Sequence, residues 1–227
     1  MMNQEACKLS AEKWRRVAVL RGLARGFTYP DQAWVATLLD GSWPSALAAA
    51  LKPWDISTEA IQGAIDQLPL GRGVALRVLQ VEYTYLFINS VPHVPAPPYA
   101  SAYTGHGWLM GPPAEAALRS YQKAGLGLRE GHDDLPDHLA TELEFAAWLG
   151  EQAIRCQEAG DEGQAEAYLR EQHAFLSSQV RPWLPTFCER VEVAARVAFY
   201  RELARLAVRA LCSDYIVPEE YPGGAER

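Results

Sequence analysis

Apolar residues recur at helical spacing along almost the whole chain, and this periodicity is the feature that most constrains the fold. No segment alternates apolar and polar residues between hairpin turns, which is the pattern of a half-buried strand. The helical pattern stops for longest at residues 89–111, where prolines and glycines cluster. Proline removes a backbone donor and fixes φ, so this stretch is predicted to be a loop. The sequence therefore predicts an all-α fold, a helical bundle of about nine or ten helices.

The proline-rich loop divides the predicted helices into two groups, an N-terminal part at residues 1–110 and a C-terminal part at residues 111–227. We expect the two parts to form one compact unit with the loop as a hinge. The N-terminal part ends with a helix predicted over residues 74–87, whose inner face is predicted to carry Val74, Val78, Val81, Tyr85 and Ile88. Asp31 is predicted to cap an earlier helix in this part.

Three long helices are predicted in the C-terminal part, over residues 136–159, 161–181 and 185–215. Gly160 suits the end of the first, and Asp161 with Gln164 resembles a capping box for the second. The third helix has a clear amphipathic period. Its buried face is predicted to carry Val193, Val197, Tyr200, Ala204 and Leu211.

Composition excludes several classes of protein. The net charge of −7 disfavours a general nucleic-acid binder, which needs a basic surface to neutralise phosphates. The apolar runs are far shorter than the roughly 18 residues of a membrane span, and residues 1–13 lack the apolar core of a signal peptide. The 4 cysteines form no CxxC pair. We therefore expect a cytoplasmic protein with reduced thiols and no cofactor of its own.

Acidic residues are concentrated between residues 130 and 144. This stretch is either a solvated acidic face or a docking surface for a basic ligand. Its carboxyl side chains belong to Glu130, Asp133, Asp134, Asp137, Glu142 and Glu144.

Asp137, His138 and Glu142 form the one cluster that could be catalytic or could bind a metal. His138 and Glu142 are spaced to share a helix face. A metal would need further ligands, and no second motif supplies them. The alternative role for Asp137 is structural, as a residue that caps the start of a helix.

The segment EYTYLF at residues 82–87 leads into the loop segment PAPPYASAY at residues 95–103. One interpretation is a rigid polyproline linker between two helical halves. The other is a preformed groove lined by aromatic side chains, which would bind a ligand at low ordering cost.

These two segments, followed by PDHLATELEFAAWL at residues 136–149 and by the helical stretch 175–206, resemble the TorD/DmsD/NarJ family. Proteins of that family are cytoplasmic chaperones for molybdenum-containing redox enzymes. The resemblance covers most of the chain from Val74 to Leu211, with the motifs in the same order. It implies an all-helical fold and a protein that is not an enzyme.

The resemblance also implies a partner, which is the catalytic subunit of a molybdopterin oxidoreductase. The chaperone would bind the twin-arginine signal peptide or another N-terminal segment of that subunit until its cofactor is inserted and export is permitted. The implied contacts are Asp137 and His138, with Glu142 beside them and a groove formed by Tyr83, Leu86, Phe87, Pro97, Pro98 and Tyr99.

Two alternatives remain at this point. One is a helical metal-binding protein or enzyme that uses Asp137, His138 and Glu142. The other is an assembly adaptor for a non-exported, nitrate-reductase-like enzyme. We expect no nucleic-acid partner and no stable membrane insertion, and the chain could be a monomer or a domain-swapped dimer.

Overall fold

The structure is a computed structural model that describes residues 2–104, 110–127 and 134–213, with side chains described from residue 11 onward. Within these ranges the chain is helical and contains no strand, as predicted, and one isolated β-bridge joins Tyr99 to His138. None of the helices in the described ranges is both long enough and apolar enough to span a bilayer. The N-terminal helices are α1 (Met2–Gly26), α2 (Gln32–Leu39), α3 (Ser42–Leu51), α4 (Glu59–Asp66) and α5 (Arg72–Tyr83). The later ones are α6 (Pro112–Lys123), α7 (Leu139–Glu158), α8 (Glu162–Phe175), α9 (Leu184–Ala194) and α10 (Ala198–Leu211).

Short helical turns extend three of these elements or lie between them. A 3₁₀ turn follows α3 at Lys52–Trp54, and another lies in the proline-rich loop at Ala100–Ala102. A single π-helical turn continues α5 over Thr84–Ile88, and a second continues α8 over Leu176–Val180.

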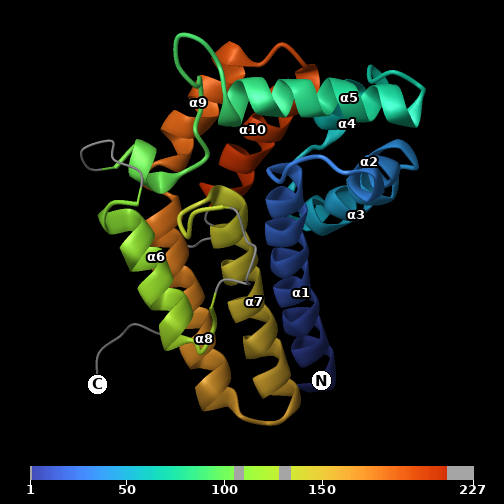
Figure 1. The fold of residues 1–227 in the computed structure, drawn as a ribbon. Helices are drawn as coiled ribbons and strands as arrows, with labels where there is room; N and C mark the ends of the chain where they lie inside the picture. The colour runs from blue at the N-terminus through green and yellow to red at the C-terminus, as the bar shows by residue number, and fades with distance from the viewer. Residues whose placement is uncertain (1, 105–109, 128–133, 214–227) are drawn as a thin grey trace.

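The helices form two connected layers (Figure 1). In the lower layer α1, α7 and α8 pack side by side, with α6 beside them. In the upper part α5 lies across the outer edge, while α4 packs against α10 and α9 packs against α10. One hydrophobic core contains buried side chains from both the N-terminal and the C-terminal helices. The division of the chain near residue 110 stays a prediction.

Local sequence signals set several helix ends where they were predicted. The Asp31 carboxylate accepts the Trp34 N–H at 2.7 Å at the start of α2. The Asp161 carboxylate accepts the Gln164 N–H at 3.0 Å at the start of α8. Gly160 has a φ of 81°, the left-handed conformation that commonly ends a helix.

The prediction of one continuous helix over residues 185–215 is wrong. The chain turns at Ala195 and Val197, whose ψ values of 122° are extended rather than helical, and this elbow separates α9 from α10. The predicted buried face fails before the elbow, where the Val193 side chain is 84% exposed. The predicted buried face is confirmed after the elbow, where Tyr200, Ala204 and Leu211 are buried. Val197 itself is half-buried.

A buried carboxylate from α5 explains the elbow, which contains neither proline nor glycine. Glu82 accepts the backbone N–H groups of Arg196 and Val197, the latter at 3.1 Å, and pairs with the Arg196 guanidinium at 2.9 Å. Glu82 is only 2% exposed. It therefore supplies from another helix the negative cap that α10 lacks in its own sequence. On the other side of the elbow, the Arg201 guanidinium donates to the Ala195 carbonyl.

The predicted inner face of α5 is wrong at Val74, Val81 and Ile88, while Val78 and Tyr85 are half-buried. Val74, Val81 and Ile88 are all more than half exposed, whereas Ala75, Leu79, Glu82 and Tyr83 are buried. The buried residues Ala75, Leu79, Tyr83 and Leu86 form a second apolar stripe at helical spacing, and this stripe faces the core. Glu82 lies on the same side and reaches the α9–α10 elbow.

We predict that Glu82→Ala lowers the free energy of unfolding by about 1–3 kcal/mol, because it leaves the backbone N–H groups of Arg196 and Val197 at the start of α10 without their acceptor. Chemical denaturation measures this change. The control is Glu192→Ala, which removes the partly exposed Arg205 pair and should cost about 0–1 kcal/mol. Equal losses in the two variants would contradict the role assigned to Glu82.

A second prediction concerns Gly150, where α1, α7 and α8 approach closely. A Cβ atom there would lie 2.7 Å from Gln172 Nε2 and 2.8 Å from Val17 Cγ2. Gly150→Ala should therefore destabilise the fold by about 1–3 kcal/mol through overpacking. Gly63→Ala in α4 is the matched control, because no atom lies within 4 Å of a Cβ atom placed at position 63. It should stabilise by up to about 1 kcal/mol, and thermal unfolding distinguishes the two signs.

Candidate functional site

The proline-rich loop is fastened to the start of α7. Leu139 N–H donates to the Pro98 carbonyl at 2.9 Å, and Ala100 N–H donates to the Asp137 carbonyl at 3.0 Å. The Ser101 N–H donates to the Asp137 carboxylate at 2.8 Å. We call residues 98–101 together with residues 137–139 the clamp. It brings together two motifs that are far apart in the sequence.

His138 lies inside the clamp with a defined tautomer. Its Nδ1 accepts the Ala140 N–H at 3.1 Å, so His138 is the N-cap of α7 and the ring proton is on Nε2. Nε2 lies 3.5 Å from the Tyr83 hydroxyl and 3.9 Å from an Asp134 carboxylate oxygen. The Tyr99 ring packs edge-on against the imidazole, with centroids 5.3 Å apart. The alternative role of Asp137 as the cap of this helix is therefore wrong, and the helix begins at Leu139 rather than at residue 136.

Asp134 and Tyr99 form the accessible part of the site, and we call these two residues the entrance. The Asp134 side chain is 46% exposed, and Tyr99 is half-buried. Burial raises the pKa of Tyr99 to about 12, and the Asp134 carboxylate contributes to that rise. The phenol is therefore neutral at physiological pH, and the entrance carries a negative charge beside an aromatic ring.

Asp137 and Glu142 do not form an exposed acidic rim, so that part of the docking-surface prediction is wrong. Both residues are fully buried, as is His138. Burial raises the pKa of Glu142 well above its usual range, and the nearby Asp137 carboxylate adds to the rise. In the predicted acidic stretch only Asp134 and Glu144 are exposed, while Glu130 and Asp133 lie outside the described residues.

The three predicted groove residues on α5 and its π-helical turn belong to the core. Tyr83, Leu86 and Phe87 are each less than 5% exposed. The Tyr83 hydroxyl donates to the Phe27 carbonyl at 3.0 Å, and the rings of Tyr83 and Phe87 pack edge-on at 4.8 Å. In the loop, Pro98 is buried and Pro97 is half-buried. Tyr83, Leu86 and Phe87 therefore lie in the core, and Pro97 and Pro98 directly precede Tyr99 in the loop.

Sequence reasoning missed the residues that connect the clamp to the rest of the fold. Tyr121 of α6 donates its hydroxyl to the Pro136 carbonyl at 2.7 Å, and Ser101 donates to Asp137. Asp134 lies four residues before His138, a spacing that could have suggested the contact. The Tyr121 and Ser101 contacts join distant segments and leave no local signal.

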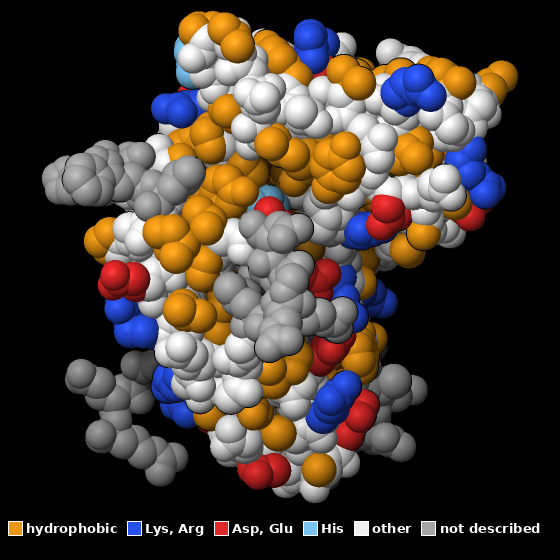
Figure 2. Space-filling model, viewed as in Figure 1, with side chains coloured by type: hydrophobic (Ala, Val, Ile, Leu, Met, Phe, Trp, Pro, Cys, Tyr) orange, Lys and Arg blue, Asp and Glu red, His pale blue; other side chains and the backbone are white. Residues whose placement is uncertain are grey.

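Figure 2 shows hydrophobic side chains gathered over the upper part of one face, around a histidine and an acidic side chain. Among the described residues no group of three or more His, Cys, Asp or Glu side chains could hold a metal ion. The geometry therefore gives no support to the metal-binding alternative that uses Asp137, His138 and Glu142.

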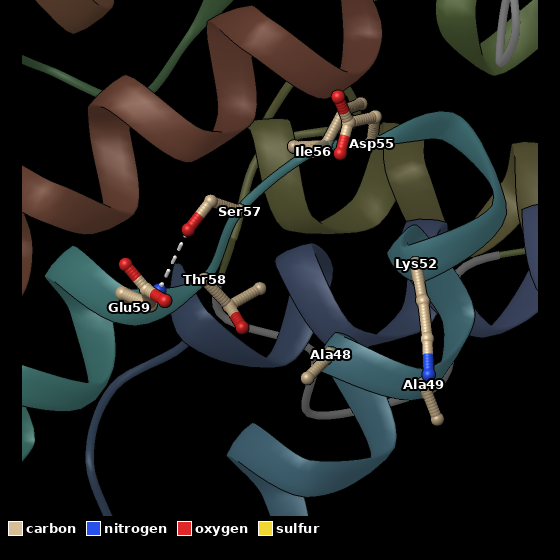
Figure 3. Close-up of a pocket in the computed structure, with 8 residues that line it drawn as sticks. All are labelled: Ala48, Ala49, Lys52, Asp55, Ile56, Ser57, Thr58 and Glu59. Atoms are coloured by element: carbon tan, nitrogen blue, oxygen red, sulfur yellow. Dashed lines mark hydrogen bonds between the residues drawn. The ribbon is translucent and has the colours of Figure 1, made fainter.

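A separate pocket of about 330 Å³ lies between the end of α3 and the start of α4 (Figure 3). Its lining includes Lys52, Asp55 and Thr58, and Glu59 N–H donates to the Ser57 hydroxyl at 3.2 Å. None of the site residues predicted from the sequence lines this pocket.

Comparison with known proteins identifies the family. A family model described as nitrate reductase delta subunit matches residues 48–189, more than half of the chain. The chaperone protein TorD of Vibrio vulnificus strain YJ016 is 34% identical over 172 residues, which are 74% of this chain and 76% of the relative. The selenate reductase assembly chaperone protein of Thauera selenatis is 41% identical over 78 residues, which are 33% of this chain and 38% of the relative.

A solved structure gives the same result. The crystal structure of a candidate redox enzyme maturation protein from Archaeoglobus fulgidus superposes with a TM-score of 0.57 and 26% identity, covering 87% of this chain and 94% of the other. Fold and relatives together define the class, which is an all-helical chaperone rather than an enzyme. The chain belongs to the nitrate reductase delta subunit family of TorD/NarJ-type chaperones, which confirms the resemblance seen in the motifs.

We predict that Asp137→Ala lowers the free energy of unfolding by about 1–3 kcal/mol, because it leaves the buried Ser101 N–H without its acceptor. Asp137→Asn keeps an acceptor oxygen and should lose clearly less. Chemical denaturation of both variants tests the contact. Equal stability of Asp137→Ala and the wild type would show that the carboxylate does not hold the loop.

Proposed function

We propose that this chaperone binds the twin-arginine signal peptide, or another N-terminal segment, of the catalytic subunit of a molybdopterin oxidoreductase. Binding would take place in the cytoplasm and hold the subunit until its cofactor is inserted and export is permitted. The family membership and the name of the selenate reductase assembly chaperone support an oxidoreductase as the partner. The chaperone itself needs no cofactor for this role.

The entrance formed by Tyr99 and Asp134 is the observation that carries the proposal. A twin-arginine leader presents two guanidinium groups, which are always charged and favour both carboxylates and aromatic faces. The half-exposed Asp134 carboxylate and the adjacent Tyr99 ring offer both kinds of contact. The hydrophobic side chains gathered on the face shown in Figure 2 would receive the apolar part of the leader.

The buried residues would act by supporting this entrance. His138 supports the Tyr99 ring edge-on, and Asp137 holds the loop through Ser101. Tyr83, Leu86 and Phe87 form a rigid floor in the core, and Pro97 and Pro98 restrict the loop backbone. A site held in one conformation loses less entropy when it binds a peptide.

A second candidate is an assembly adaptor for a non-exported, nitrate-reductase-like enzyme. The description of the matching family as the nitrate reductase delta subunit favours it. Such an adaptor would bind a client segment that lacks the twin-arginine motif. Comparing a leader peptide with a client from which the leader has been removed separates the two candidates.

We predict that Asp134→Asn weakens the binding of a synthetic twin-arginine leader peptide by about 0.2–1 kcal/mol, the range for a partly exposed ion pair. The wild-type affinity should fall as salt is raised, because exposed charges are screened within about 10 Å at 0.1 M. The variant should show a smaller salt dependence. Calorimetric titration at two salt concentrations measures both effects.

Asp161→Asn is the control, because it also removes one carboxylate but caps a distant helix, where asparagine caps nearly as well. It should bind the leader like the wild type. If Asp134→Asn and Asp161→Asn bind with the same affinity and the same salt dependence, the proposed entrance is wrong.

A further inference from the structure

Glu142 is a carboxyl group inside the fold that the proposed peptide contacts do not use. It lies in the first turn of α7, where its N–H donates to the His138 carbonyl at 3.0 Å. Its side chain is fully buried, and neither carboxyl oxygen has a hydrogen-bond partner among the described residues. One carboxyl oxygen of Asp137 is also buried without a hydrogen-bond partner among the described residues. Two buried carboxyl groups with unpartnered oxygens therefore lie in the clamp, at Asp137, and in the first turn of the helix that follows it, at Glu142.

The groups around Glu142 make a second negative charge unfavourable. Asp137 adds to the rise in the pKa of Glu142, and the Trp183 indole lowers that pKa. The indole N–H donates to the Gln179 carbonyl at 2.7 Å. From α6, Tyr121 contributes a neutral phenol whose pKa is raised by burial. On α7 itself, the His138 ring accepts a backbone N–H and is neutral.

Cations on the neighbouring elements are engaged elsewhere. On α1, Arg21 pairs with Glu151 and Arg25 pairs with Asp31. On the segment that carries Trp183, Arg181 donates to the Cys212 carbonyl and Arg190 lies over the Tyr103 ring. From α8, the Gln172 amide donates to the Ala146 carbonyl. These described cations therefore have partners other than Glu142, and burial disfavours the ionised form of its carboxyl group.

We propose that Glu142 links proton binding to closure of the clamp: it holds a proton while residues 98–101 are fastened to residues 137–139, and it releases that proton when the loop loosens. With the clamp closed, the Asp137 carboxyl group accepts the Ser101 N–H. Ionisation of Glu142 would set a second carboxylate against Asp137, and loosening of the loop relieves that repulsion by admitting water. Glu142 is thus a positioning residue.

The sign of the pH dependence follows from linkage. The closed clamp raises the pKa of Glu142, so the loosened state binds fewer protons than the closed state. Raising the pH therefore favours loosening, by up to about tenfold per pH unit between the two pKa values. Above the pKa of the closed state the dependence ends. The clamp is tightest at mildly acidic pH and loosest at alkaline pH.

Infrared spectroscopy and amide hydrogen exchange test this proposal without a leader peptide. At about pH 8, where ordinary carboxyl groups are ionised, the wild type should keep a protonated carboxyl band. Glu142→Gln should lack that band. Glu158→Gln, on an exposed position of the same helix, should retain it. The wild-type measurement needs no variant to fold, and absence of the band at this pH overturns the proposal.

Exchange of the Ser101 amide reports on the clamp itself. Its protection factor in the wild type should fall by up to about tenfold per pH unit. Leu203 in the core of α10 reports global unfolding and should keep a higher protection factor than Ser101 at each pH. In Glu142→Gln, a neutral residue of the same shape, the Ser101 protection should be independent of pH. The same slope in the variant as in the wild type would overturn the proposal. Because neither measurement uses a leader, failure of the proposed leader binding is distinguishable from failure of the proton link.

Discussion

The buried carboxylate of Glu82 is the contact on which the arrangement of the upper helices depends. It caps α10 from α5, pairs with Arg196, and fixes the elbow between α9 and α10. The Arg196 guanidinium also lies 3.6 Å from the centroid of the Tyr85 ring, which ties the end of α5 to the same elbow. Because one carboxylate satisfies two backbone donors and one cation, the rotation of α5 and the direction of α10 are set together. Val74 and Val81 lie on the exposed side of α5.

The candidate site is a consequence of the same rotation. With Glu82 directed at the elbow, the next residue, Tyr83, points into the core and reaches the Phe27 carbonyl and His138. The proline-rich loop then leaves the end of α5 and returns across the start of α7, where backbone hydrogen bonds fasten it. A loop that resembles a linker in the sequence is therefore joined to α7 by backbone hydrogen bonds and by one isolated β-bridge. This explains how a proline-rich segment can present Tyr99 in a fixed position beside Asp134.

Buried acidic groups serve three different purposes in this fold. Glu82 is fully paired and organises helices. Asp137 is partly satisfied and holds the loop. Neither carboxyl oxygen of Glu142 has a hydrogen-bond partner among the described residues, and burial raises its pKa. The sequence shows these residues only as members of acidic or helical stretches. Their roles differ because burial and the available donors differ, and both depend on which distant segments meet.

The sequence alone determined the helical class, most helix ends and the family. These follow from local signals, since apolar period, capping residues such as Asp31 and Asp161, and left-handed Gly160 act within one or two turns. The order of the motifs likewise needs only the chain. Tertiary structure alone decided the α9–α10 elbow, the exposed face of α5 and the burial of Asp137, His138 and Glu142. Those features arise where segments more than thirty residues apart exchange hydrogen bonds, as Ser101 does with Asp137 and Arg196 with Glu82. A buried charge must be satisfied by whichever donors the fold brings to it, and no local pattern records that choice.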